Sequence, residues 1–147
     1  MADFFNYKET LIQVLEQVKP ARIFEWGPGE STDIMRTHSP GAFIMSVEHD
    51  PSWFKKMSER FQDVEVLLAQ NEEYVFAPVF THLGGYDLFF VDGRQRVRCL
   101  LSAWQKLNKG GAIVLHDAER EEYKPGISAL QALGMTVSGT QTTKVFR

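Results

Sequence analysis

Along this chain, segments whose apolar residues have the spacing of a helix alternate with segments whose composition is typical of strands. Residues 3–19 carry apolar side chains at helical spacing until Pro20 ends the pattern. Residues 97–107 repeat apolar positions at i, i+3, i+4, i+7 and i+10, which predicts an amphipathic helix that Gly110 and Gly111 terminate. The segments between the helical patterns are short, apolar and rich in strand formers.

These short segments predict a sheet that a hairpin closes. Strands are expected at residues 22–26, 43–48, 64–69, 86–91 and 112–115. A short helix at residues 126–133 precedes the predicted hairpin of residues 135–138 and 143–146. The segment 71–82 is ambiguous and could hold a short helix. The run at 86–91 is apolar except at Asp87, as expected for a central strand covered on both faces.

The alternation predicts one α/β domain over residues 1–147. Its expected architecture is a doubly wound, Rossmann-like, mostly parallel sheet of about seven strands with a C-terminal antiparallel hairpin. The length of 147 residues, with 44% hydrophobic and 24% charged positions, suits one domain. Ligands of such sheets bind at the carboxyl ends of the strands, so functional residues are expected there.

Charge and cysteine content narrow the class of protein. The formal net charge of −3 argues against a general nucleic-acid partner. There is no apolar run of about 18 residues that would span a membrane. The N-terminal residues lack the basic start and apolar run of a signal peptide. Cys99 is the single cysteine and lies in an apolar helical stretch, which predicts a core thiol. We therefore expect a cytoplasmic protein.

A glycine-rich turn follows the first predicted strand and opens a helix. Gly27 and Gly29 allow a sharp turn and close approach of the backbone to a ligand, and Ser31 is expected to cap the helix. Two ligand classes use such a turn: a dinucleotide, whose pyrophosphate lies on the helix N-terminus, and S-adenosylmethionine. The dinucleotide fingerprint would place a third glycine at Thr32, which weakens that interpretation.

The charges around the glycine turn also help to choose between a dinucleotide and S-adenosylmethionine as the ligand. Glu25 and Glu30 flank it, and each carboxylate near a pyrophosphate costs on the order of 1 to 4 kcal/mol, depending on screening. The ammonium and sulfonium groups of S-adenosylmethionine would instead be attracted. Glu48 ends the second predicted strand and can accept both ribose hydroxyls of either ligand. Glu48 thus indicates an adenosine without choosing between the two.

Together, these motifs resemble those of the class I S-adenosylmethionine-dependent methyltransferases. The resemblance covers residues 21–117 with matching order and spacing: Glu-x-Gly-x-Gly-x-Ser at 25–31, the acidic Glu48, and the strand motifs at 86–92 and 107–115. The endings Val91-Asp92-Gly93 and Leu115-His116-Asp117 are similar to those of small-molecule O-methyltransferases.

The resemblance implies a set of cofactor-binding residues. Glu25 would contact the methionyl ammonium, directly or through water, and Ser31 could bond the methionyl carboxylate. The cofactor would lie over Gly27 and Gly29, and Glu48 would hold its ribose. The remaining contacts would come from His49 beside the adenine, Gln70 and Asn71 at the adenine edge, and Asp92 beside the methyl group. Many relatives carry an aspartate in place of the 70–71 pair.

Asp92, His116 and Asp117 are the candidates for the acceptor side. Much of the rate of methyl transfer can come from holding acceptor and methyl in line, and a base that removes the acceptor's proton adds roughly 10²- to 10⁴-fold. His116 titrates nearest to neutral pH. In related catechol-type enzymes carboxylates at these two strand ends bind a divalent ion. Asp92 and Asp117 could do the same, but the sequence offers no clear third ligand. We therefore assign no metal-binding residue and leave open whether a divalent ion bridges the two carboxylates.

Three arginines follow Asp92. Arg94 is near enough to the strand end to meet an anionic substrate, whereas Arg96 and Arg98 are expected on a solvated helix face. The chain is nearly minimal for this fold and lacks an inserted cap. The helix at residues 3–19 or a partner subunit could therefore cover the site, and the latter makes a homo-oligomer a possible arrangement.

The sequence thus predicts an S-adenosylmethionine-dependent methyltransferase acting on a hydroxyl or carboxyl oxygen of a small molecule. Three alternatives stay open: an S-adenosylmethionine-binding module without activity, an NAD-dependent oxidoreductase, and transfer of the cofactor's aminocarboxypropyl group.

Overall fold

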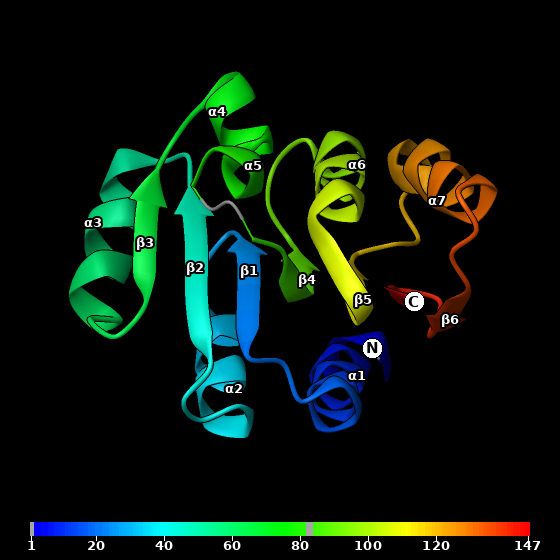
Figure 1. Ribbon diagram of the computed structural model, residues 1–147, viewed down its shortest axis with the longest axis horizontal. Coiled ribbons are helices and arrows are strands. Elements are labelled where there is room, and N and C mark those ends of the chain that lie inside the picture. The colour runs from blue at the N-terminus through cyan, green and yellow to red at the C-terminus, as the bar shows by residue number, and fades with distance from the viewer. Residues whose placement is uncertain (1, 82–83) are drawn as a thin grey trace.

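The computed structural model describes the backbone of residues 2–81 and 84–147, and the side chains in these ranges from Tyr7 onward. Seven strands form one sheet: β1 (Arg22–Trp26), β2 (Phe43–Glu48), β3 (Glu65–Leu68), β4 (Tyr86–Val91), β5 (Leu107–His116), β6 (Val137–Gly139) and β7 (Thr143–Phe146). Their order is β3-β2-β1-β4-β5-β7-β6 (Figure 1). Strands β1 to β5 are parallel, and β7 is antiparallel to both of its neighbours. This confirms the predicted doubly wound fold and its closing hairpin.

Helices cover both faces of the sheet. One face carries α1 (Ala2–Val18), α2 (Glu30–His38) and α3 (Pro51–Arg60). The other carries α4 (Asn71–Val75), α5 (Ala77–Thr81), α6 (Arg96–Lys106), the 3₁₀ turn η1 (Glu121–Tyr123) and α7 (Lys124–Ala132). No helix in the described ranges is both long and apolar enough to cross a membrane.

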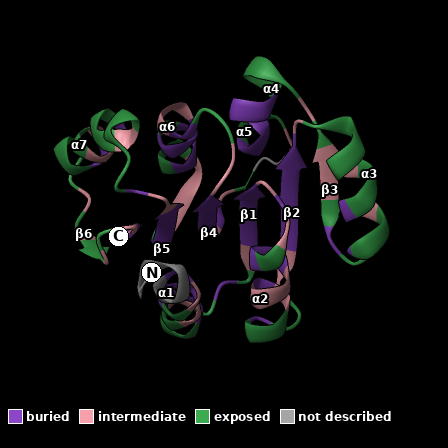
Figure 2. Ribbon diagram, turned by 180° about the vertical axis from the view of Figure 1, so that it is seen from behind, coloured by how far each residue is buried: buried purple, intermediate pink, exposed green. Residues whose placement is uncertain are grey.

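Alternate side chains of the strands build two hydrophobic cores. In β4, Leu88 and Phe90 pack with α1, α2 and α3, whereas Phe89 and Val91 pack with the helices of the opposite face. Figure 2 shows the central strands buried and the outward sides of the helices exposed. Burial on both faces explains why most positions of the central strands are apolar rather than alternating with polar ones.

One predicted boundary is wrong. Helix α6 ends at Lys106, and Gly110 and Gly111 lie inside β5 rather than beyond a helix. A side-chain carbon at Gly111 would stand 2.5 Å from the carbonyl oxygen of Asp87. This glycine therefore permits the close approach of β5 to β4, at a place where the register between the two strands shifts.

The segment that was ambiguous in the sequence forms two short helices, α4 and α5. The last residue of that segment, residue 82, lies outside the described residues. Cys99 is fully buried, as predicted for a core thiol, and burial raises its pKa.

Candidate functional site

A cavity of about 500 Å³ opens at the carboxyl ends of β1, β2, β4 and β5, where the fold predicts a ligand. This volume lies in the range that small-molecule sites occupy. The lining comes from α1, α3, the glycine turn with the start of α2, and the ends of β2, β4 and β5: Tyr7, Gly27, Pro28, Gly29, Glu30, Ser31, Glu48, His49, Trp53, Asp92, Gly93, Arg94 and His116. Seven of the eleven candidate residues named from the sequence are among them; Glu25, Gln70, Asn71 and Asp117 are not.

Gly27 lets the turn fit between two strands. Its φ of +87° is unfavourable for other residues, and a side-chain carbon here would stand 2.7 Å from the carbonyl oxygen of Asp92. The Gly27 amide donates to the carbonyl of Val47 (3.0 Å), and the Asp92 amide donates to that of Trp26 (3.3 Å). The turn is thus fixed to β2 and to the end of β4.

Glu25 lies behind the turn rather than in the cavity wall. Its fully buried carboxylate accepts hydrogen bonds from the hydroxyls of Ser31, Thr32 (2.6 Å) and Ser46 (2.7 Å). Burial raises the pKa of Glu25 to about 7, although the three donors oppose the shift. In this position the side chain ties the start of α2 to β1 and β2, and the predicted contact with an ammonium group stays a prediction.

The expectation that Ser31 caps its helix is wrong. The N-cap of α2 is Gly29, whose amide donates to Thr32 Oγ1 (3.0 Å), and the Thr32 amide donates to the Gly29 carbonyl (3.1 Å). Ser31 lies inside the first turn, where its hydroxyl turns inward and donates to Glu25. Its place in the cavity lining keeps the predicted cofactor contact open.

The second strand end presents an oriented carboxylate. Glu48 is 5% exposed and lines the cavity. Its Oε2 accepts from the Asp50 amide (2.8 Å) and lies 3.2 Å from His49 Nδ1. Trp53, which the sequence did not single out for this site, forms a further part of the wall and donates from Nε1 to the Pro28 carbonyl (2.8 Å). This end of the cavity can accept hydroxyl groups beside an aromatic surface.

Gln70 and Asn71 are exposed, and neither is among the described residues that line the cavity. Gln70 Nε2 donates to the carbonyl of His49 (3.2 Å), so it supports the backbone of a lining residue. Their predicted contact with adenine stays a prediction.

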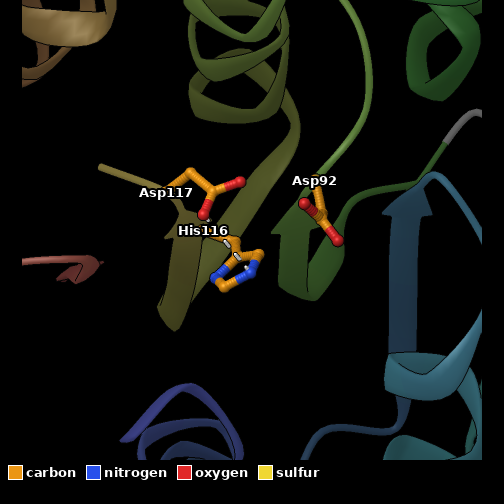
Figure 3. Close-up of side chains that lie close together, drawn as sticks. All are labelled: Asp92, His116 and Asp117. Atoms are coloured by element: carbon orange, nitrogen blue, oxygen red, sulfur yellow. Dashed lines mark ion pairs between the residues drawn. The ribbon is translucent and has the colours of Figure 1, made fainter. Parts of the chain in front are cut away.

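The acceptor candidates come together at the ends of β4 and β5 (Figure 3). Asp92, His116 and Asp117 each have a potential ligand atom within 4.8 Å of the others, and His116 Nε2 is 3.6 Å from Asp117 Oδ1. Burial raises the pKa of Asp92, although the nearby His116 and Arg96 oppose the shift. A carboxylate with a raised pKa beside a cavity is suited to proton transfer.

Arg96 is the functional residue that the sequence reasoning placed wrongly. Its side chain is 9% exposed, and its Nη2 lies 3.1 Å from Asp92 Oδ1 while its Nη1 lies 3.4 Å from Asp117 Oδ2. Long side chains of a helix lean toward its N-terminus, which brings this first residue of α6 back over the strand ends. The four-residue spacing from Asp92 to Arg96 was the available signal. Arg98 is partly exposed and pairs with Glu72 (2.6 Å) at the protein surface.

These contacts decide whether a divalent ion fits between the two carboxylates. Asp92, His116 and Asp117 are close enough together to offer three ligand atoms. However, the guanidinium of Arg96 already contacts both carboxylates, and a metal ion there would meet a like charge. The residues present therefore do not fit a metal ion bridging Asp92 and Asp117.

Tyr7 brings α1 into the cavity wall. Its ring centroid lies 4.6 Å from that of His116 and 5.8 Å from that of Phe90. Lys8 forms an ion pair with Glu30 of the glycine turn (3.3 Å). The sequence placed Tyr7 on the apolar face of its helix without a role in the site. The structure shows that this face also borders the cavity.

Solved structures show what this fold has in common with known proteins. A methyltransferase-like protein from Silicibacter pomeroyi is similar in structure, with 21% sequence identity and a TM-score of 0.73. The similarity covers 95% of this chain and 82% of the Silicibacter chain. An O-methyltransferase, TomG from Streptomyces achromogenes, solved with S-adenosylmethionine, matches 95% over 77% of its own chain (13% identity, TM-score 0.71). A putative O-methyltransferase from Klebsiella pneumoniae matches 96% over 79% of its own chain (18% identity, TM-score 0.74).

No protein-family model matches the chain, and no curated protein matches its sequence. The structural similarities nevertheless extend over nearly the whole chain. The protein has the Rossmann-like fold of the class I S-adenosylmethionine-dependent methyltransferases, with their C-terminal antiparallel strands.

Proposed function

We propose that the protein is an S-adenosylmethionine-dependent methyltransferase that methylates a hydroxyl or carboxyl oxygen of a small molecule. The observation that carries this proposal is a single cavity with two chemically different ends. Glu48, at the end of β2, lies on one side of the glycine turn, and Asp92 and His116, at the ends of β4 and β5, lie on the other. A cytoplasmic location belongs to the same proposal.

The residues around the turn fit the proposed cofactor. Glu48 would accept the ribose hydroxyls, since its carboxylate is already oriented by the Asp50 amide. The methionyl group would lie against the turn at Gly29 and Ser31, and Trp53 would flank the nucleoside. When bound, the cofactor supplies an electrophilic methyl group on a sulfonium.

Asp92 and His116 would act on the acceptor. The raised pKa of Asp92 favours accepting a proton from an acceptor hydroxyl, and Tyr7 together with His116 narrows the space in which the acceptor is held. Positioning would supply much of the rate, because an in-line arrangement removes most of the entropic cost of the encounter.

The charges in and around the cavity disfavour the dinucleotide alternative. Glu30 lines it at the glycine turn, where the pyrophosphate of a dinucleotide would lie near its carboxylate. The alternatives that keep the same cofactor differ in product. A module without activity would give no product, and transfer of the aminocarboxypropyl group would release methylthioadenosine.

The proposal is tested by turnover. The protein, incubated with S-adenosylmethionine and a panel of hydroxylated and carboxylated small molecules, is expected to release S-adenosylhomocysteine with at least one acceptor. Asp92→Asn should reduce that turnover by roughly 10²-fold or more, because it removes the base, whereas Asp63→Asn on the surface should not. Full activity of Asp92→Asn would show that Asp92 is not the base. Release of methylthioadenosine instead of S-adenosylhomocysteine would show that the protein transfers the aminocarboxypropyl group rather than the methyl group.

A further inference from the structure

A guanidinium bridges the two carboxylates at the acceptor end of the cavity. Arg96 Nη2 is 3.1 Å from Asp92 Oδ1, and Arg96 Nη1 is 3.4 Å from Asp117 Oδ2. The side chain is 9% exposed, so solvent screens these ion pairs only weakly. Asp92 and Asp117 end neighbouring strands (Figure 3), and Arg96 therefore links β4 to β5 through charge.

Further contacts fix Arg96 in this place. Its Nε donates to the Gly93 carbonyl (2.8 Å), and its Nη1 donates to the His116 carbonyl (2.7 Å). The guanidinium carbon also lies 5.1 Å from the centre of the Tyr123 ring. A guanidinium stays charged at any physiological pH, and its rigid fork suits several acceptors at once. The positive charge between the carboxylates is thus permanent and immobile.

We infer that Arg96 is the resident cation of this site: it holds Asp92 and Asp117 in place and keeps a divalent metal ion out of the space between them. A metal ion bound by these carboxylates would stand beside the guanidinium and would be repelled by its charge. Arg96 is a positioning residue, since its donors already serve the protein's own oxygens. The inference rests on the proposed function only in calling this end of the cavity the acceptor end.

Titration with Mn²⁺, followed by the electron paramagnetic resonance signal of the free ion, tests the inference without any substrate. Mn²⁺ accepts the mixed carboxylate and imidazole ligands present here. The wild-type protein is expected to leave Mn²⁺ free up to about 1 mM, the weak limit of protein sites for hard cations. Arg96→Gln should bind Mn²⁺ at least about tenfold more tightly, because it removes the buried positive charge that lies between Asp92 and Asp117.

Two further variants locate the effect. Arg98→Gln, on the same helix but paired with Glu72, should behave as the wild type does. Adding Asp92→Asn to Arg96→Gln should abolish the gained binding. Removal of Arg96 takes away the ion-pair partner of Asp92 and leaves Asp117 with Arg120 (3.5 Å). The variant is therefore expected to be less stable, and Mn²⁺ should raise its Tm but not that of the wild type.

Two results would contradict the inference that Arg96 keeps a metal ion out. Submillimolar binding of Mn²⁺ to the wild type, lost in Asp92→Asn, would overturn the inference, and this arm decides even if Arg96→Gln does not fold. A folded Arg96→Gln that gains no Mn²⁺ binding would overturn it as well. Titration of the wild type with S-adenosylhomocysteine reports on the proposed function separately, so failure of one is distinguishable from failure of the other.

Discussion

Among single residues, Glu25 connects the stability of the fold to pH. Its pKa is raised to about 7 by burial, above the usual 4.5, so the folded protein holds this proton more tightly than the unfolded chain does. The stabilisation is present below about pH 4.5 and is lost as pH rises through about 7. Between pH 5 and pH 8 the loss is roughly 2 to 3 kcal/mol.

Glu25→Gln removes this titration while keeping the shape of the side chain. We expect the free energy of unfolding of the variant to fall less than that of the wild type between pH 5 and pH 8, by roughly the same 2 to 3 kcal/mol. Urea unfolding of both proteins at several pH values measures the difference. Parallel curves for the two proteins would mean that Glu25 is not the group that titrates.

Glu48 carries the prediction that concerns the nucleoside. Glu48→Ala should weaken binding of S-adenosylhomocysteine by roughly 10- to 100-fold, since a ribose hydroxyl loses a charged acceptor worth about 1.5 to 3 kcal/mol. Glu59→Ala removes an exposed carboxylate from α3, away from the cavity, and should leave the affinity unchanged. Calorimetry on both variants decides, and equal affinities would remove Glu48 from the ribose site.

Single residues at the strand ends could be predicted because their order along the chain fixes their place in a parallel sheet. Asp92 and His116 follow neighbouring strands, so a sequence with the right strands brings them together. Tyr7 and Arg96 could not be assigned in this way. Their roles depend on where a helix packs and which way its side chain leans, and neither is encoded in local periodicity.

Among the elements, the glycine turn allows the steric contact with β4 to be separated from backbone strain, by comparing substitutions at Gly27 and Gly41. Gly27→Ala places a methyl group 2.7 Å from a backbone carbonyl and also strains a φ of +87°. Gly41 has the same φ of +87° but nothing within 4 Å of an added side-chain carbon. Both substitutions should cost about 1 to 3 kcal/mol from backbone strain, and Gly27→Ala should cost more.

The excess loss at Gly27 measures the close approach of the turn to β4. It should appear in thermal unfolding and should be accompanied by weaker binding of S-adenosylhomocysteine, because the turn forms the cavity wall. Equal losses at Gly27 and Gly41, without a change in affinity, would show that the turn accommodates a side chain.

Helices and strands with a clear period of apolar residues could be predicted from the sequence, but the residues at which they end could not always be predicted. The helix of residues 96–106 and the strand of residues 86–91 follow directly from apolar spacing. The end of that helix was missed because glycines usually terminate helices, whereas here Gly111 serves the contact between two strands. Only the tertiary neighbour, the Asp87 carbonyl, distinguishes the two uses.

For the molecule as a whole, the parallel sheet explains why residues distant in sequence form one site. Four strand ends meet at the same edge, the helices of both faces bury the sheet behind them, and α1 reaches the cavity from one side. The fold is shared over nearly the whole chain with solved structures of an O-methyltransferase, a putative O-methyltransferase and a methyltransferase-like protein. The central claim is that this edge of the sheet binds S-adenosylmethionine.

Parallel calorimetric titrations of the wild-type protein with S-adenosylmethionine, S-adenosylhomocysteine and NAD test that claim most directly. We expect micromolar binding of the first two, at one site per chain, and no binding of NAD. Binding of NAD without S-adenosylmethionine or S-adenosylhomocysteine would contradict it.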